Sequence, residues 1–159
     1  MSRVVPDYPP WWNTTITVFN KYEDPLTHTI TWYKTVVPGC FWQFIGSKLT
    51  VKQVVLDASS ITCRIPQDTN FMRKSEWVNL PNDQMHKYFT LGLGDIIVAG
   101  AVSDIIDEYT TGHRSTDVLN KYSQYQECIE IGSVAINIGG SRNHPHYLIT
   151  DGDSRTWSY

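Results

Sequence analysis

The chain contains 159 residues and carries a formal net charge of −3, with 18% charged and 13% aromatic residues. This length fits one ordinary domain, and this share of charged residues is typical of a folded chain rather than a disordered one. A protein that grips nucleic acid along its phosphates carries a basic surplus, so such a protein is not expected. The aromatic residues, with many Thr, Ile and Val, favour strands over helices. We therefore predict a β-rich domain.

Three features of the sequence bear on its cellular environment. The longest apolar stretches, such as Ile96–Ala99, are too short to span a bilayer, so no membrane partner is expected. Residues 1–7 contain no apolar signal-peptide segment. The three cysteines are an odd number without CxxC spacing, and we expect buried free thiols in a reducing compartment: Cys40, Cys63 and Cys128.

The first part of the chain predicts an arm and a series of strands. Residues 1–13 hold three prolines and should form an extended arm. Alternating apolar and polar residues then predict five strands, at residues 14–19, 27–37, 40–45, 49–56 and 60–65. Turn residues indicate two hairpins. One joins the first two strands and ends at Pro38-Gly39, and the other joins the last two.

Residues 66–87 interrupt this pattern and predict a long irregular loop. Loops of this length inside a compact domain are uncommon and more often functional than not. The loop carries three apolar residues and a basic pair, which are Phe71, Met72 and Trp77, and Arg73 and Lys74. We expect a neighbouring subunit to cover the apolar side chains, and the basic pair to face DNA or an acidic neighbour. The alternatives are that Phe71 and Trp77 cap an open end of the barrel and that the basic pair is simply solvated.

The second part of the chain predicts one helix among strands. A buried strand over 96–100 is expected, which Ile105-Ile106 could prolong, and the helix should span 115–127 with Ser115 or Thr116 as its cap. Further strands are expected over 129–138 and 147–150. The predicted fold is mainly β: a small barrel or sandwich with one inserted helix and a long loop. Its predicted parts are an arm over 1–13, a domain over 14–150 and a polar tail over 151–159.

The glycines and histidines do not predict a cofactor or metal site. Gly92-Leu93-Gly94 lacks a third glycine and precedes a strand, whereas the dinucleotide fingerprint opens a helix. His144 and His146 could share a face of a strand and bind a metal, but Pro145 separates them and no third ligand lies nearby. We therefore expect no cofactor and no metal.

The carboxylates and possible nucleophiles do not predict catalysis either. Asp104, Asp107 and Glu108 form an acidic cluster that could carry acid–base chemistry, but a solvated turn is the better interpretation. The sequence has no GxSxG motif and no cysteine in an activating context. We expect no catalytic residues and do not expect an enzyme.

The aromatic residues suggest binding surfaces. Most lie in predicted strands and should belong to the core, although a sugar-binding face is an alternative because flat rings stack on pyranose rings. Trp11 and Trp12 differ, since they follow the proline-rich arm. Adjacent residues of an extended chain point in opposite directions, so one ring can dock on its own barrel while the other meets a partner subunit.

Several segments carry a resemblance to a known group of proteins. They are WWNTTITVFNKYED (11–24), TWYKTV (31–36), CFW (40–42) and FTLGLGDIIVAG (89–100). These resemble small proteins of tailed phages and prophages of Gram-positive bacteria, encoded among the head–tail joining genes. The ending VAINI (134–138) and HYLITDG (146–152) resembles the last strands of minor capsid, or stopper, proteins of the phage neck.

The resemblance implies a structural virion protein. Such proteins are β-barrels that form a ring, commonly of six copies, with the portal and adaptor above and the tail terminator or tail tube below. The ring closes the head after DNA packaging, and the packaged DNA lies in its channel without sequence-specific binding. The chain would then reside in the virion neck, and in the host cytoplasm during assembly.

Three alternatives remain beside a stopper-like ring subunit. The long segment 66–87 and the inserted helix leave open an adaptor or a tail terminator. A soluble carbohydrate-binding module is the alternative from another class. A small metal-dependent enzyme that uses His144 and His146 comes third.

Overall fold

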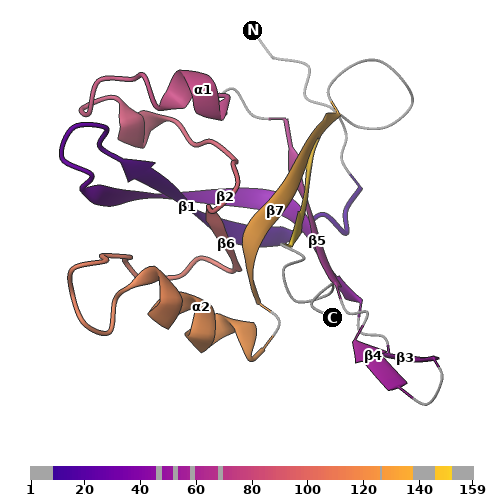
Figure 1. Ribbon diagram of the computed structural model, residues 1–159. Coiled ribbons are helices and arrows are strands. Elements are labelled where there is room, and N and C mark those ends of the chain that lie inside the picture. The colour runs from indigo at the N-terminus through magenta and orange to yellow at the C-terminus, as the bar shows by residue number, and fades with distance from the viewer. Residues whose placement is uncertain are drawn as a thin grey trace, which may run out of the picture.

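The structure is a computed structural model that describes residues 9–45, 48–51, 54–57, 60–67, 70–125, 127–137 and 146–151. Within these ranges the chain forms a closed six-stranded barrel and a separate two-stranded sheet (Figure 1). The strands are β1 (Thr14–Glu23), β2 (Ile30–Ile45), β3 (Lys48–Val51), β4 (Val54–Asp57), β5 (Ser60–Pro66), β6 (Ile96–Ala99), β7 (Cys128–Asn137) and β8 (His146–Asp151). The helices are α1 (Lys74–Trp77), the 3-10 turn η1 (Met85–Lys87) and α2 (Ser115–Ser123). The predicted mainly β fold is confirmed, and the strands form a barrel.

The barrel is closed because each of its six strands pairs with two neighbours. Its order is β1-β2-β5-β8-β7-β6, and β6 pairs with β1 to complete the ring. All neighbouring strands are antiparallel. Closure removes the edge strands at which other chains commonly add a strand, although β5 begins to pair with β2 only at Phe41 and residues 30–37 of β2 have β1 as their strand partner.

β2 is longer than the sequence indicates. Its first half pairs with β1 and its second half with β5, so the strand continues through Pro38-Gly39 instead of ending there. Gly39 has φ +73°, which a glycine adopts without strain. The register between β1 and β2 shifts at this point, where Thr14 faces Cys40 and Ile16 faces Val37. The glycine thus forms a bulge that bends one strand around the barrel, and the prediction of two strands is wrong.

The predicted second hairpin is also wrong. Residues 49–56 are divided between β3 and β4, which pair with each other, with Leu49 facing Leu56. β5 pairs instead with β2 and β8. In Figure 1 the β3–β4 sheet projects away from the barrel. Alternation of apolar and polar residues is the same in one long strand and in two short ones, so the pattern could not separate them.

Two clusters of buried residues stabilise the fold. The larger fills the barrel and includes Ile16, Val18 and Ile97. The smaller lies outside the barrel, where α2 covers β6, and consists of Phe19, Ile96, Val98, Ile106, Val118 and Cys128. Successive residues of a strand face opposite sides, so the same strands supply both clusters. Cys40, Cys63 and Cys128 are buried free thiols, as predicted.

The second half of the chain largely follows the prediction, with two corrections. α2 ends at Ser123 rather than at residue 127, because the Glu127 carbonyl accepts a hydrogen bond from the Ala99 N–H and continues into the sheet. Its N-cap is Arg114, not Ser115 or Thr116, and the Asp117 carboxylate accepts the Arg114 N–H at 3.1 Å. Ile105 and Ile106 do not prolong β6. No helix in the described parts of the chain is long and apolar enough to cross a membrane.

Only part of the arm and tail can be compared with the prediction. Residues 1–8 and 152–159 lie outside the described residues. Residues 9–12 form a turn that the Trp12 N–H closes onto the Pro9 carbonyl at 2.9 Å, so this part of the arm is not extended. Pro10 supplies the φ angle that the second residue of such a turn requires.

Candidate functional site

The segment predicted as an irregular loop is folded against the barrel. It contains α1 and η1, and in Figure 1 α1 lies on the opposite side of the β1–β2 hairpin from α2. A short parallel bridge joins Phe71 to Phe89, with the Met72 N–H 2.9 Å from the Phe89 carbonyl and the Phe89 N–H 3.0 Å from the Asn70 carbonyl. Phe89 and Leu91 belong to the barrel core. The segment is therefore an integral part of the fold.

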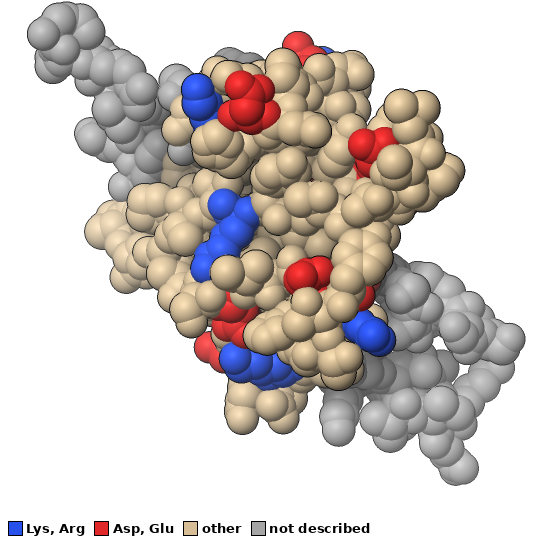
Figure 2. Space-filling model, turned by 90° about the vertical axis from the view of Figure 1, so that its left-hand side faces the viewer, with Lys and Arg blue, Asp and Glu red and all other residues tan. Residues whose placement is uncertain are grey.

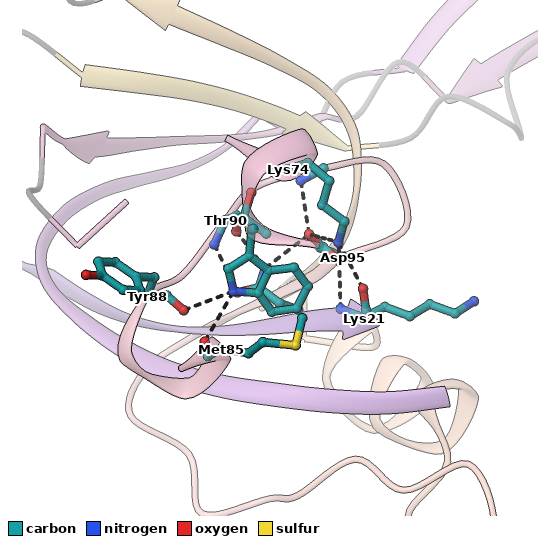
Figure 3. A network of polar contacts seen from close by, with 9 residues as sticks. Lys21, Lys74, Met85, Tyr88, Thr90 and Asp95 are labelled. Atoms are coloured by element: carbon teal, nitrogen blue, oxygen red, sulfur yellow. Dashed lines mark hydrogen bonds and ion pairs between the residues drawn. The ribbon is translucent and has the colours of Figure 1, made fainter. Parts of the chain in front are cut away.

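Trp77 is a core residue and not an interface residue. Its side chain is fully buried, and its indole N–H donates to the carbonyls of Met85 at 3.2 Å and Tyr88 at 3.3 Å (Figure 3). The rings of Tyr22 and Tyr33 meet its ring edge-on, with centroids 6.3 and 5.6 Å away. The expectation that Trp77 contacts a neighbouring subunit is wrong, because its ring is fully buried within its own chain. Burial of so large a ring stabilises the packing of the segment against the barrel.

Lys74 also faces inward. Its Nζ lies 3.0 and 3.2 Å from the carboxylate oxygens of Asp95, donates to the Lys21 carbonyl at 3.0 Å, and lies 4.9 Å from the centre of the Trp77 ring. Asp95 is fully buried. A buried carboxylate needs a counter-charge, and Lys74 supplies it. The expectation that Lys74 faces DNA or an acidic partner is therefore wrong.

Asp95 is the centre of a polar network that sequence reasoning missed. Besides Lys74, its carboxylate accepts the N–H groups of Lys21 at 2.9 Å and Gly92 at 3.0 Å, and the Asn20 side-chain amide at 3.0 Å (Figure 3). Asn20 in turn forms two hydrogen bonds with the backbone of Thr90. Burial raises the pKa of Asp95, although Lys74 opposes this. The network joins the segment to β1 and stabilises the fold there.

The remaining predicted loop residues line a surface pocket of about 270 Å³. Its walls are Phe71, Met72, Arg73, Glu76, Ile136 and Tyr147. Phe71 stacks on Tyr147 with ring centroids 4.2 Å apart and an interplanar angle of 27°. The fold thus brings three predicted residues together with three that the sequence did not indicate. Glu76 belongs to α1 in the same segment, whereas Ile136 and Tyr147 face each other in the β7–β8 pair, which the loop sequence does not indicate.

Trp11 and Trp12 have different environments. The Trp12 ring packs on Phe41 and edge-on against His146, with centroids 6.2 and 5.7 Å away, while Trp11 is 64% exposed. Trp12 therefore anchors the turn on its own barrel. The role of Trp11 in contacting a partner subunit stays a prediction.

The two histidines of the predicted HxH pair can be placed only in part. His146 is buried beside Trp12, and His144 lies outside the described residues. No group of three His, Cys, Asp or Glu side chains that could hold a metal occurs in the described part of the chain.

The acidic cluster stabilises the segment before α2. Asp104 accepts hydrogen bonds from Tyr122 and Lys121, and Glu108 accepts the Trp32 indole N–H at 3.1 Å and the Ser115 hydroxyl at 2.6 Å. Burial favours the neutral acid of Glu108, but the hydrogen bonds from Ser115 and Trp32 outweigh it and lower the pKa of this carboxyl. These carboxylates hold the chain in place around α2.

The surface charge is mixed on the face that carries the β1–β2 turn. Figure 2 shows Lys and Arg side chains interspersed with Asp and Glu among a largely uncharged surface. Arg73 is exposed. This face does not present the single-sign surface that a general nucleic-acid binder uses.

Comparison with known proteins places the chain in a family. Residues 11–150 match a family of unknown function, DUF6751, and the chain belongs to it. No curated protein matches the chain. No solved structure matches it.

Proposed function

We propose that this member of the family is a structural subunit of the phage neck, a ring-forming head–tail connector protein of the stopper type. The observation that carries the proposal is the contrast between Trp12, which is anchored on the barrel, and Trp11, which leaves 64% of its surface exposed. A large aromatic ring on a fixed support loses little entropy when a partner covers it. Such a ring is typical of a subunit that associates.

The closed barrel supports assembly through side chains. Each described barrel strand already pairs with two neighbours, which disfavours joining of copies by addition of a strand to the barrel sheet. Contacts then depend on the turn before β1, on the loops and on the projecting β3–β4 sheet. These features suit a ring in which rigid barrels meet through separate contact surfaces.

The resemblance of residues 11–24 and 89–100 to head–tail joining proteins supports the choice of the phage neck. In the proposed assembly the chain forms a hexameric ring that lies between the portal and adaptor on one side and the tail terminator or tail tube on the other. Packaged DNA fills its channel without sequence-specific contacts. The ring closes the filled head and provides the surface to which the tail attaches.

Electron microscopy tests this function directly. The purified full-length protein should form closed rings with a channel, alone or with portal complexes, and gold-labelled antibody should mark the neck of phage particles. A chain that stays monomeric with portal complexes and binds glycans on an array would overturn the proposal in favour of a carbohydrate-binding module. Labelling at the portal or at the tail end would assign it instead as an adaptor or a tail terminator.

A further inference from the structure

The pocket between the 70–76 segment and the end of the β7–β8 pair is suited to one large side chain. Its volume is about 270 Å³, whereas small-molecule sites usually span roughly 300–1,000 Å³. The floor is the Phe71–Tyr147 stack, and Ile136 adds an apolar wall that is 39% exposed. Exposed apolar surface of this kind is stabilised when another apolar group covers it.

The polar residues of the pocket narrow the choice of occupant. Arg73 and Glu76 are both exposed and carry opposite charges. A carboxylate accepts an N–H donor, and a guanidinium is attracted to the face of an aromatic ring. An indole ring offers both features, since it has one N–H donor and a large π face. The pocket is therefore complementary to a tryptophan side chain.

The chain itself supplies such a side chain. Among the tryptophans in the described ranges, Trp11 alone is exposed, and it does not occupy the pocket of its own barrel. Trp12 holds the turn against Phe41 and His146, so the backbone that carries Trp11 is anchored to the barrel before any partner binds. Such pre-organisation lowers the entropy lost on association.

We propose that Trp11 of one copy inserts into the pocket lined by Phe71, Met72, Ile136 and Tyr147 of the next copy, with Glu76 accepting its indole N–H and Arg73 lying against its ring. The contact joins two different surfaces, so repeated contacts form a ring if the rotation closes and a helical filament if it does not. This inference rests on the proposed function and identifies the contact between subunits.

Three variants of the full-length protein test the contact. Trp11→Ala removes the inserted side chain, and Ile136→Glu places a charge in the pocket beside Glu76. Tyr125→Ala is the matched control, because Tyr125 is also 64% exposed but lies beyond the end of α2. Thermal unfolding of each variant identifies any loss of fold. Sedimentation equilibrium and native mass spectrometry then measure self-association.

The first two variants should each weaken self-association roughly 30-fold or more, the effect of removing a tryptophan hot spot, whereas Tyr125→Ala should associate like the wild type. A mixture of Trp11→Ala and Ile136→Glu keeps one intact contact. It should therefore form a heterodimer that does not grow further. A Trp11→Ala variant that associates like the wild type overturns the inference, as does a mixture that forms no heterodimer.

The inference and the proposed function can fail separately. Rings that persist in the Trp11→Ala variant overturn the inference and leave the proposed function intact. If the wild type forms no rings even with portal complexes, the proposed function fails. A synthetic peptide of residues 4–14 titrated into the Trp11→Ala protein then decides the pocket on its own: saturable binding that Ile136→Glu abolishes supports it, and no binding overturns it.

Discussion

Replacing Lys74 with Met should destabilise the fold at pH 7, because it leaves the Asp95 carboxylate buried without its counter-charge. Breaking a buried ion pair by removing one partner costs about 3–5 kcal/mol. Two features reduce the cost here. The Lys74 side chain is 32% exposed, and Asp95 keeps its hydrogen bonds from Lys21, Gly92 and Asn20. We expect a loss of about 2–3 kcal/mol in the free energy of unfolding.

Urea unfolding followed by tryptophan fluorescence measures this loss, and the melting temperature should fall by about 4–12 °C in a chain of this size. Lys87→Met is the matched control, because Lys87 is an exposed lysine of the same segment and lies in η1. That variant should unfold like the wild type.

The effect of Lys74→Met should also depend on pH. Burial already raises the pKa of Asp95, and removing Lys74 takes away a charge that lowers it. The variant therefore has a still higher pKa at Asp95, and protonation relieves the buried charge as the pH falls. The destabilisation should shrink from neutral toward acid pH. A loss below about 0.5 kcal/mol at pH 7, the size of an ordinary surface substitution, would contradict this prediction.

Three further predictions concern the same fold. Trp77→Ala should lower the free energy of unfolding by about 3–5 kcal/mol, the cost of deleting a buried aromatic ring, and Trp77→Phe by less; equal losses in urea unfolding would contradict this. The raised pKa of Asp95 means that the folded chain binds this proton more tightly than the unfolded chain does. The stability that the Asp95 proton contributes is therefore present at low pH and is lost as the pH rises through the folded-state pKa. The stability of the wild type minus that of Asp95→Asn should therefore fall with rising pH, and a rise measured over a series of buffers would disprove it. Gly39→Ala should lower the free energy of unfolding by about 1–2 kcal/mol, because φ +73° is strained for alanine, while the added Cβ comes no closer than 4.0 Å to the Trp12 carbonyl oxygen. An unchanged thermal midpoint would contradict the claim that this backbone conformation requires glycine.

The elements of this protein that local pattern controls could be predicted from its sequence. Local residue pattern indicates the strands that became β1, β6, β7 and β8, with period-two alternation in β1 and a short apolar run in β6, and the apolar spacing from Ser115 indicates α2. The burial of the three cysteines follows from residue type, because a free thiol behaves as a small apolar side chain. These features depend on neighbouring residues alone, so the sequence contains their cause.

Tertiary structure alone decided the continuity and partners of the strands. Pro38-Gly39 reads as the end of a strand, yet the bulge at Gly39 carries β2 from one neighbour to the next. Residues 49–56 read as one strand, yet they form the separate β3–β4 sheet. Strand pairing depends on contacts between distant parts of the chain, which local periodicity does not record.

The candidate site could also be predicted from the sequence only in part. The apolar character of Phe71, Met72 and Trp77 indicates that their side chains should be shielded from water. It does not indicate whether a partner or the barrel shields them. The barrel takes Trp77 and Lys74, because a large ring and the counter-charge of buried Asp95 are both stabilised inside the fold. Phe71 and Met72 instead line a pocket completed by Ile136 and Tyr147, which are more than sixty residues away in the sequence. Residue type determined which side chains would avoid water, and the closure of the barrel determined which of them remained at the surface.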